Sequence, residues 1–423
     1  MIFTLAVIPV VFLALGTPVF LVFLSGAVLT LFFVLPTPPV VLHQVIFGGL
    51  DNYALLAVPF FVFAGELMAA SGIASRLIVF VLALTGRLPG SLGVATVGAS
   101  AAIGAISGSS AAAVAALGKT LYPKLVGAGY GTERSAGLLA SAGAIDIVIP
   151  PSIAMILYGL AAEQSIPRLF VAGVLPGLLI ALLMATFIVA VAVVKKLPIS
   201  GSFDPREIWS ATKGAVWAIL MPVVILGGIY NGWFSPTEAG GFACLYAMIV
   251  ARFIYRSMTW AEIIRSAANS AMLSAQIMII VAAAGVLTWL LTTQGVPQAI
   301  VAGMEAMNMS LVTFLLAVNL VLLVVGCFLD PTSAILVLAP LLVPIAVSVG
   351  VDPIHFGIIM TVNLAIGMFT PPFGLNLFVA QTVTNLPVHS LYRGVLPFVA
   401  VQIIALVIIT YVPQLSLMLG ASL

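Results

Sequence analysis

Charged residues are scarce in this sequence. Lys and Arg number 14 and Asp and Glu number 12 among 423 residues, so 6% of the chain is charged and the net charge is +2. About a quarter of a soluble domain is charged, whereas 63% of this chain is hydrophobic and its mean hydropathy is +1.31. This composition excludes an ordinary soluble protein. The lack of a basic cluster also argues against nucleic acid as a partner.

Cysteine and histidine are scarce too, which limits the chemistry available to the chain. Cys244 and Cys327 lie in apolar runs without metal-ligand spacing, and we interpret both as small core residues. His43, His355 and His389 are isolated and predicted to lie in loops, so no histidine-built metal site is expected. No HExxH, P-loop or paired aspartate-rich motif occurs, which argues against a membrane enzyme or an ATP-driven pump.

Long apolar runs dominate what remains. They do not alternate in ~10-residue units as the strands of a membrane barrel do, so we predict an all-α polytopic protein in a lipid bilayer. The first residues lack a positive segment and a cleavage site, and we expect them to stay part of the fold. Several runs approach or exceed the ~20 residues that cross a membrane, most clearly 54–71, 91–117, 169–194, 213–231, 236–254, 272–293, 310–329 and 394–418.

The chain contains two copies of one unit. A diproline occurs at 150–151 and again 221 residues later at 371–372. In a chain this apolar, matched hydrophobic residues are expected by chance, but matched helix breakers are not. The same displacement relates Pro123 to Pro344, Gly129 to Gly350, and the tetrapeptide GVLP at 173–176 to GVLP at 394–397.

Lys and Arg predict opposite orientations for the two copies, because these residues favour cytoplasmic loops. In the first copy the short connections carry Arg76, Arg87, Lys119, Lys124 and Arg134. The corresponding connections of the second copy, 297–308 and 340–355, contain no Lys or Arg. We therefore predict two inverted-topology repeats, 1–194 and 213–423, joined by a cytoplasmic linker at 195–212.

Each copy is predicted to contain a re-entrant hairpin followed by a broken helix. The hairpins are 88–127, with the tip SGSS at 107–110, and 309–349, with the tip LDPTS at 329–333. The broken helices are 137–163 and 356–383, each interrupted at its diproline. The first 35 residues form a pair broken at Gly16-Thr17-Pro18, and 2–14 is short for a full span.

Helix breaks at membrane depth free main-chain groups that protein or a water-filled cavity must receive. Freed carbonyls suit a small hard cation, and half-helix N-termini suit an anion. A kink for packing is the alternative for any single break, but the pairing of four breaks by the repeat favours a site.

Carboxylates in membrane segments are further candidates, because a charge at the bilayer centre costs ~2.5–3.5 kcal/mol. Asp146 and Asp330 both lie at breaks, and an N-cap of the following helix is the alternative for Asp330. We interpret Glu66 as structural near a cytoplasmic helix end, and Glu238 as a helix cap behind Pro236.

Several separated motifs resemble the large membrane subunit of tripartite ATP-independent periplasmic (TRAP) transporters, within the ion-transporter superfamily. They cover essentially the whole chain and occur in the family's order. They are SGSSAAAVAALG at 107–118, IPPSIAMILYG at 149–159, LFVAGVLPG at 169–177, FSPTEAG at 234–240 and NLAIGMFTPPFGLNLFVA at 363–380.

This resemblance implies a sodium-driven importer of small organic acids in the bacterial inner membrane, with no other cofactor. It also implies an elevator mechanism, in which a transport domain, here 88–176 and 309–397, moves against a scaffold. The implied partners are a periplasmic substrate-binding protein and a small four-helix membrane subunit. No additional four-helix unit occurs in the sequence, so we expect that subunit to be a separate chain.

The resemblance also implies two sodium sites, with mostly carbonyl ligands. The first involves Ser107, Ser110, Gly143, Val148 and Pro150, and the second Gly326, Gly367, Thr370 and Phe373. Asp146 stands where many relatives have glycine, and we expect it to add a charged ligand to the first site. For the solute, the expected contacts are Ser109, Ser110, Pro151, Ser152, Thr332, Pro371, Pro372 and Asn376.

Two other functions remain open from the sequence. A stand-alone carrier for dicarboxylates or inorganic anions, from the same superfamily, would share these features but need no binding protein. A channel would share the broken helices and show far higher conductance.

Overall fold

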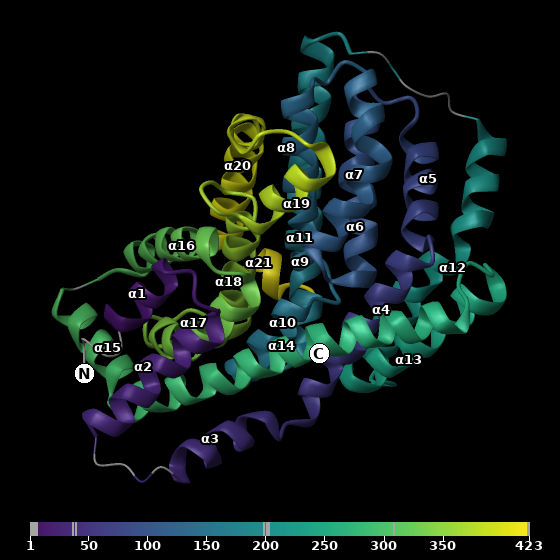
Figure 1. The fold of residues 1–423 in the computed structure, drawn as a ribbon. Helices are drawn as coiled ribbons and strands as arrows, with labels where there is room; N and C mark the ends of the chain where they lie inside the picture. The colour runs from purple at the N-terminus through teal and green to yellow at the C-terminus, as the bar shows by residue number, and fades with distance from the viewer. Residues whose placement is uncertain are drawn as a thin grey trace.

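The computed structural model describes residues 7–35, 38, 40–197, 199, 204–307 and 309–420, and these residues form helices with no β-strand (Figure 1). Among them, eight helices are long and apolar enough to cross a membrane, or nine if one bent pair counts as a span. They are Tyr53–Ala70 (η2 with α4, Ala57–Ala70), α11 (Ile166–Val194), α12 (Pro205–Tyr230), Pro236–Ile254 (α13, Pro236–Ile249, with η3), α14 (Trp260–Thr293), α16 (Leu311–Phe328), α17 (Pro331–Ser348) and α20 (Val388–Tyr411).

One apolar run is not a single helix. The run 91–117 is divided between two helices, α6 (Ser91–Ser107) and α7 (Ser110–Gly127), because Gly108 takes a left-handed conformation (φ 57°) that ends α6. The two helices and the turn between them occupy the predicted hairpin 88–127. The predicted run 394–418 ends earlier as a helix, since α20 stops at Tyr411 and a short α21 (Gln414–Leu417) follows.

The boundaries near the termini and the linker are also defined. A break at Gly16–Pro18 separates α1 (Ile8–Ala14) from α2 (Val19–Phe33), as predicted, although residues 1–6 lie outside the described part. The helix α12 begins at Pro205, with Asp204 accepting a hydrogen bond from the Arg206 amide (2.8 Å). Residues 205–212, assigned to the linker from the sequence, are therefore helical, and 198 and 200–203 lie outside the described residues.

The two halves share one order of elements at the displacement of 221 residues found in the sequence. Displaced by that number, α17 coincides with α7, and α16 with α6 to within one residue at its start. The other corresponding pairs are α15 (Val296–Ala306) with α5 (Ile73–Thr85), α18 (Pro353–Gly367) with α8 (Thr132–Gly143), α19 (Leu375–Thr384) with α10 (Ile153–Ala161), α20 with α11, and α14 with α3 (Val40–Leu50) plus α4.

The long α14 is a platform on which both halves rest. In Figure 1 it runs, in green, across the lower part of the molecule. It packs against α2, α3 and α4 of the first half and α15 and α17 of the second. Elsewhere the halves interlock, since α8 packs on α20, α7 on α19 and α10 on α17.

Glycine permits the closest of these contacts. A Cβ on Gly137 of α8 would collide with the backbone of Gly394 in α20, and a Cβ on Gly394 would collide with the Glu133 carbonyl. Two helices approach this closely only where neither presents a side chain. The pair Gly137–Gly394 therefore fixes how the first broken helix sits on the second half.

The prediction that the three histidines lie in loops is wrong. His43 lies in α3, His355 in α18 and His389 in α20. His355 is buried, and its ring nitrogens lie 3.2 Å from Ser416 Oγ and 3.2 Å from the Thr410 carbonyl. Asp352 caps the start of α18 by accepting hydrogen bonds from the Ile354 and His355 amides, and Pro387 directly precedes α20, so His355 and His389 lie in the first turns of helices.

Candidate functional site

The first hairpin tip is a sharp turn built by Gly108. Its φ of 57° reverses the chain after α6, and Ser109 is extended before α7 begins. A Cβ on Gly108 would lie 3.1 Å from the Pro151 carbonyl, so the tip rests on the first diproline. The backbone conformation and the space both require glycine here.

The segment predicted as the first broken helix is divided in the structure. It consists of α8, the four-residue α9 (Ile145–Val148) and α10, and its two parts are bent by 45°. The peptide Pro150-Pro151 lies in the break and is cis, as is Pro371-Pro372. Ser152 caps α10 by accepting a hydrogen bond from the Met155 amide (3.3 Å).

Asp146 connects this break to the first hairpin. The side chain is fully buried, and it accepts hydrogen bonds from Ser100 Oγ at 3.3 Å and Ser107 Oγ at 3.4 Å. Gly104 of α6 makes room for it, because a Cβ there would lie 2.6 Å from Asp146 Cα. Within the described residues Asp146 has no basic partner, so its charge is offset only by two long hydroxyl contacts. A buried carboxylate of this kind is a favourable neighbour for a cation.

Gly143 lies beside the same tip. A Cβ at this position would be 3.1 Å from the Ser110 carbonyl and 3.3 Å from Ser110 Oγ. The structure thus brings together four of the residues predicted for the first sodium site: Ser107, Ser110, Gly143 and Asp146. The Val148 carbonyl instead lies against Gly173 of α11, 2.7 Å from where a Cβ would be, and Pro150 is buried in the break.

The second tip is closed by an N-cap. Asp330 Oδ2 accepts from the Ser333 amide at 3.1 Å, and Asp330 Oδ1 from Ser333 Oγ at 2.6 Å. The cap interpretation of Asp330 is therefore confirmed, as is that of Glu238, which forms a capping box with Ser235. Both carboxylates hold helix starts in place.

The second broken helix runs from α18 to α19 through a non-helical stretch at 368–374. Gly367 and Gly326 are in backbone contact, since a Cβ on Gly326 would lie 3.2 Å from Gly367 Cα. Thr370 folds back on α18, its amide donating to the Gly367 carbonyl (3.1 Å) and its hydroxyl to the Ile366 carbonyl (2.7 Å). Phe373 is 54% exposed and packs on Phe328.

A buried polar knot joins the two copies. Asn376 Nδ2 donates to Ser110 Oγ at 2.7 Å and to the Ala140 carbonyl at 2.9 Å, and its Oδ1 accepts from Ser110 Oγ at 3.0 Å. Asn376 is fully buried and Ser110 is 3% exposed. The start of the second half-helix α19 is thereby tied to the first hairpin and to α8.

A cavity of about 640 Å³ lies where the two tips meet α4 and α14. Of the predicted residues, Ser107, Ser109, Ser110 and Thr332 line it, and so does Asp330. The other predicted solute contacts are not among its lining residues: Pro151, Ser152 and Asn376 are buried in the fold, and Pro371 and Pro372 lie elsewhere, the Pro372 carbonyl accepting a hydrogen bond from Tyr392 (2.6 Å).

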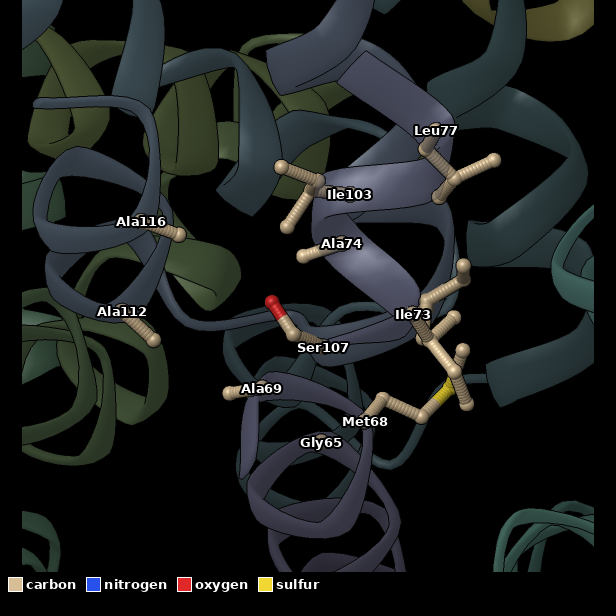
Figure 2. A pocket seen from close by; sticks show the side chains of 11 residues that line it. Gly65, Met68, Ala69, Ile73, Ala74, Leu77, Ile103, Ser107, Ala112 and Ala116 are labelled. Carbon is tan, nitrogen blue, oxygen red and sulfur yellow. The ribbon is translucent and has the colours of Figure 1, made fainter. Parts of the chain in front are cut away.

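A smaller pocket adjoins the first tip. Figure 2 shows the Ser107 hydroxyl directed into a space between Ala69 and Ala74 on one side and Ala112 and Ala116 of α7 on the other. Gly65 of α4 lies directly against the tip, because a Cβ on it would be 3.3 Å from Ser107 Cβ. The first tip therefore touches α4 through a residue without a side chain.

Four cavity residues escaped the sequence prediction: Glu66 of α4, and Asn269, Ser270 and Gln276 of α14. Glu66 was interpreted as structural near a helix end, whereas it faces the cavity. The available signal was the seven-residue interval between Asn269 and Gln276, which places two amides on one helix face.

Comparisons with known proteins agree with this architecture. Residues 6–415 match the family described as "Tripartite ATP-independent periplasmic transporter, DctM component". The chain is 43% identical over 396 residues to the C4-dicarboxylate TRAP transporter large permease protein DctM of Pseudomonas aeruginosa, covering 94% of this chain and 92% of that protein. It is 37% identical over 409 residues to the isethionate TRAP transporter permease protein DctMQ of Oleidesulfovibrio alaskensis, covering 96% of this chain and 64% of that protein.

A solved structure also shares the fold. The YdaH transporter of Alcanivorax borkumensis is similar with a TM-score of 0.56 at 16% sequence identity, over 90% of this chain and 87% of that chain. These matches define a transporter permease component, a multi-pass protein of the bacterial inner membrane and not an enzyme. The chain belongs to the DctM family of TRAP transporter large permeases.

Proposed function

We propose that this chain is the membrane-translocating subunit of a sodium-coupled importer for a small organic acid. The observation that carries the proposal is the meeting of both hairpin tips with α4 and α14 at one cavity. The volume of about 640 Å³ suits a small solute. The cavity borders both parts of the fold that an elevator mechanism moves against each other.

Sodium coupling is supported by the backbone at the two breaks. Gly143 lies beside the Ser110 carbonyl, and Gly367 lies beside the Gly326 carbonyl, so at both places a main-chain carbonyl of one helix lies against a glycine of another. Carbonyl oxygen is a good ligand for a small hard cation. Bound sodium would order each break, and the solute would then bind a site already formed, which couples the two.

The moving part is proposed to comprise residues 88–176 and 309–397, which hold α6–α10, α16–α19 and the first parts of α11 and α20, with α4 and α14 belonging to the scaffold. The tie between Asn376 and Ser110 supports movement of the first hairpin and the second broken helix as one body, because it joins α7 to α19. The contact of Gly65 with Ser107 supports a smooth boundary between scaffold and moving part.

The partners are proposed from the family. A tripartite system implies a small membrane subunit and a periplasmic binding protein. One relative is named as a combined DctMQ permease, which supports a small subunit placed against this one. The names of the relatives include different solutes, C4-dicarboxylate and isethionate, so the family does not select one acid.

Uptake into proteoliposomes containing this chain and its small subunit, with the cognate binding protein outside, tests the proposal. Radiolabelled acid should accumulate only with an inward sodium gradient. Accumulation that persists with choline in place of sodium and follows a proton gradient would contradict sodium coupling. Uptake by this chain alone, without a binding protein, would favour a stand-alone carrier, and single-channel conductance would favour a channel.

A further inference from the structure

The scaffold side of the cavity carries polar groups that sodium coupling does not explain. Glu66, Asn269, Ser270 and Gln276, here called the polar wall, line it together with the two tips. Within the described part of the chain, the side chains of Glu66, Asn269 and Gln276 make no hydrogen bond or ion pair. Ser270 is 4% exposed, and its hydroxyl is buried without a hydrogen-bond partner.

Helix geometry places these groups in line. Asn269, Leu273, Gln276 and Ile280 follow one another at intervals of four, three and four residues, so they share one face of α14. Ser270 flanks that face. Amides that packed against protein would have hydrogen-bond partners, and amides facing lipid carry a large cost. Asn269 and Gln276 are exposed and line the cavity, so a polar ligand bound there would supply the hydrogen-bond partners that the protein does not.

The charge of the cavity restricts that ligand. Its lining contains two carboxylates, Glu66 and Asp330, and no Lys, Arg or His. Both oxygens of Asp330 accept hydrogen bonds from Ser333, whereas Glu66 is free to accept from a ligand. A second carboxylate on the solute would meet like charge without compensation, which is costly in a partly desolvated cavity. Hydroxyl or ammonium groups would instead donate to Glu66.

We propose that the polar wall is a solute subsite which selects acids with a single carboxylate and a hydrogen-bond-donating body. The inference rests on the proposed function and names its substrate class. The tips receive the carboxylate of the solute, and Glu66 accepts from its hydroxyl or ammonium groups. Asn269, Ser270 and Gln276 complete the contacts along α14, and simple dicarboxylates are disfavoured.

Thermal unfolding of the purified full-length chain in sodium chloride tests this subsite without a binding protein. The probes are the monoanionic hydroxy acids glycerate, threonate and gluconate, against succinate and glutarate. A hydroxy acid should raise the melting temperature at a concentration at least tenfold lower than the concentration that either dicarboxylate needs for the same increase. Glu66→Gln keeps the shape of the side chain and removes its charge. This variant should weaken binding of the hydroxy acid about tenfold and reduce the preference for hydroxy acids over dicarboxylates.

A control variant and a second test variant accompany Glu66→Gln. Glu163→Gln removes the charge of an exposed loop carboxylate and should leave the preference unchanged. Ser270→Ala is nearly isosteric. It should weaken binding of the hydroxy acids and leave binding of the dicarboxylates unchanged, which keeps the inference testable if Glu66→Gln does not fold.

The possible outcomes separate the inference from the proposed function. A preference for succinate, or a preference that Glu66→Gln and Ser270→Ala leave intact, overturns the subsite while acid transport stands. A sodium dependence altered by Glu66→Gln would assign Glu66 to a cation site and also overturn it. If none of the five acids stabilises the chain in sodium, the subsite is overturned, and the uptake experiment with the partner subunits then decides the proposed function separately.

Discussion

Asp146 is the residue whose role can be tested most simply. It is a fully buried carboxylate, compensated only by Ser100 and Ser107, and it lies beside the tip where we propose a sodium site. An uncompensated buried charge is costly, and a bound cation would remove that cost. A carboxylate at this position therefore has a physical use in the proposed site.

Replacing Asp146 by Asn should weaken sodium binding. The variant keeps the size of the side chain and one acceptor oxygen, and its amide nitrogen can donate to the second serine hydroxyl, but it removes the negative charge. We expect the sodium concentration for half-maximal uptake to rise about tenfold, which corresponds to ~1.4 kcal/mol. Sodium titration of uptake measures this.

Asp51→Asn is the matched control, because Asp51 is an exposed carboxylate outside the cavity lining. Its sodium dependence should equal that of the unaltered chain. An equal sodium dependence in Asp146→Asn would remove Asp146 from the cation site and leave it a purely structural contact between α9 and α6.

Several residues could not have been placed from the sequence. The matched diprolines located both breaks, because a break is a local property of Pro and Gly. That Asn376 would bond to Ser110, 266 residues away, depends on the packing of α19 against α7. Glu66 was misjudged for the same reason, since its exposure to the cavity depends on α14.

At the scale of elements, α8 and α20 illustrate how helix packing depends on glycine, which has no side chain. The two helices belong to different copies, and they meet where Gly137 faces Gly394. Sequence periodicity predicts each helix but not this contact, because a glycine in the sequence can also mark a kink or a helix end. The helix boundaries, in contrast, follow from local signals such as the capping box at Ser235 and Glu238.

Gly137→Ala should destabilise the fold. The added methyl group would collide with the Gly394 backbone, which no rotamer change can relieve, and overpacking of this kind costs ~1–3 kcal/mol or more. We expect a lower melting temperature in detergent and reduced yield of monodisperse protein.

Gly285→Ala in α14 is the control, because nothing lies within 4 Å of a Cβ at that position. Removing a glycine from a helix interior stabilises it by ~0.5–1 kcal/mol, so this variant should melt at the same or a higher temperature. Similar melting temperatures for the two variants would show that α8 and α20 do not approach as closely as described.

For the whole molecule, the proposed elevator motion requires the first hairpin tip to leave α4. A Cβ on Gly65 would lie 3.3 Å from Ser107 Cβ, close to the Cβ separation of a disulfide. The double variant Gly65→Cys with Ser107→Cys should therefore form a disulfide on mild oxidation. Cross-linking should abolish uptake. Reduction with dithiothreitol should return uptake to the level of the double variant before oxidation.

Each single variant should be insensitive to oxidation, because the native Cys244 and Cys327 are buried. Retention of full uptake by the completely cross-linked double variant would exclude a sliding boundary at α4. It would instead require gating within a fixed cavity.

The most direct measurement of the central claim is sodium-dependent hydrogen exchange of the backbone at both breaks. Amides of 143–152 and 367–374 are followed by mass spectrometry in sodium chloride and in choline chloride at equal ionic strength. If sodium binds there, exchange should be slower in sodium at both stretches and at the tip 107–110, and exchange in α12 should be unchanged. Identical exchange in the two salts at both breaks would contradict the claim that the interrupted main chain binds sodium.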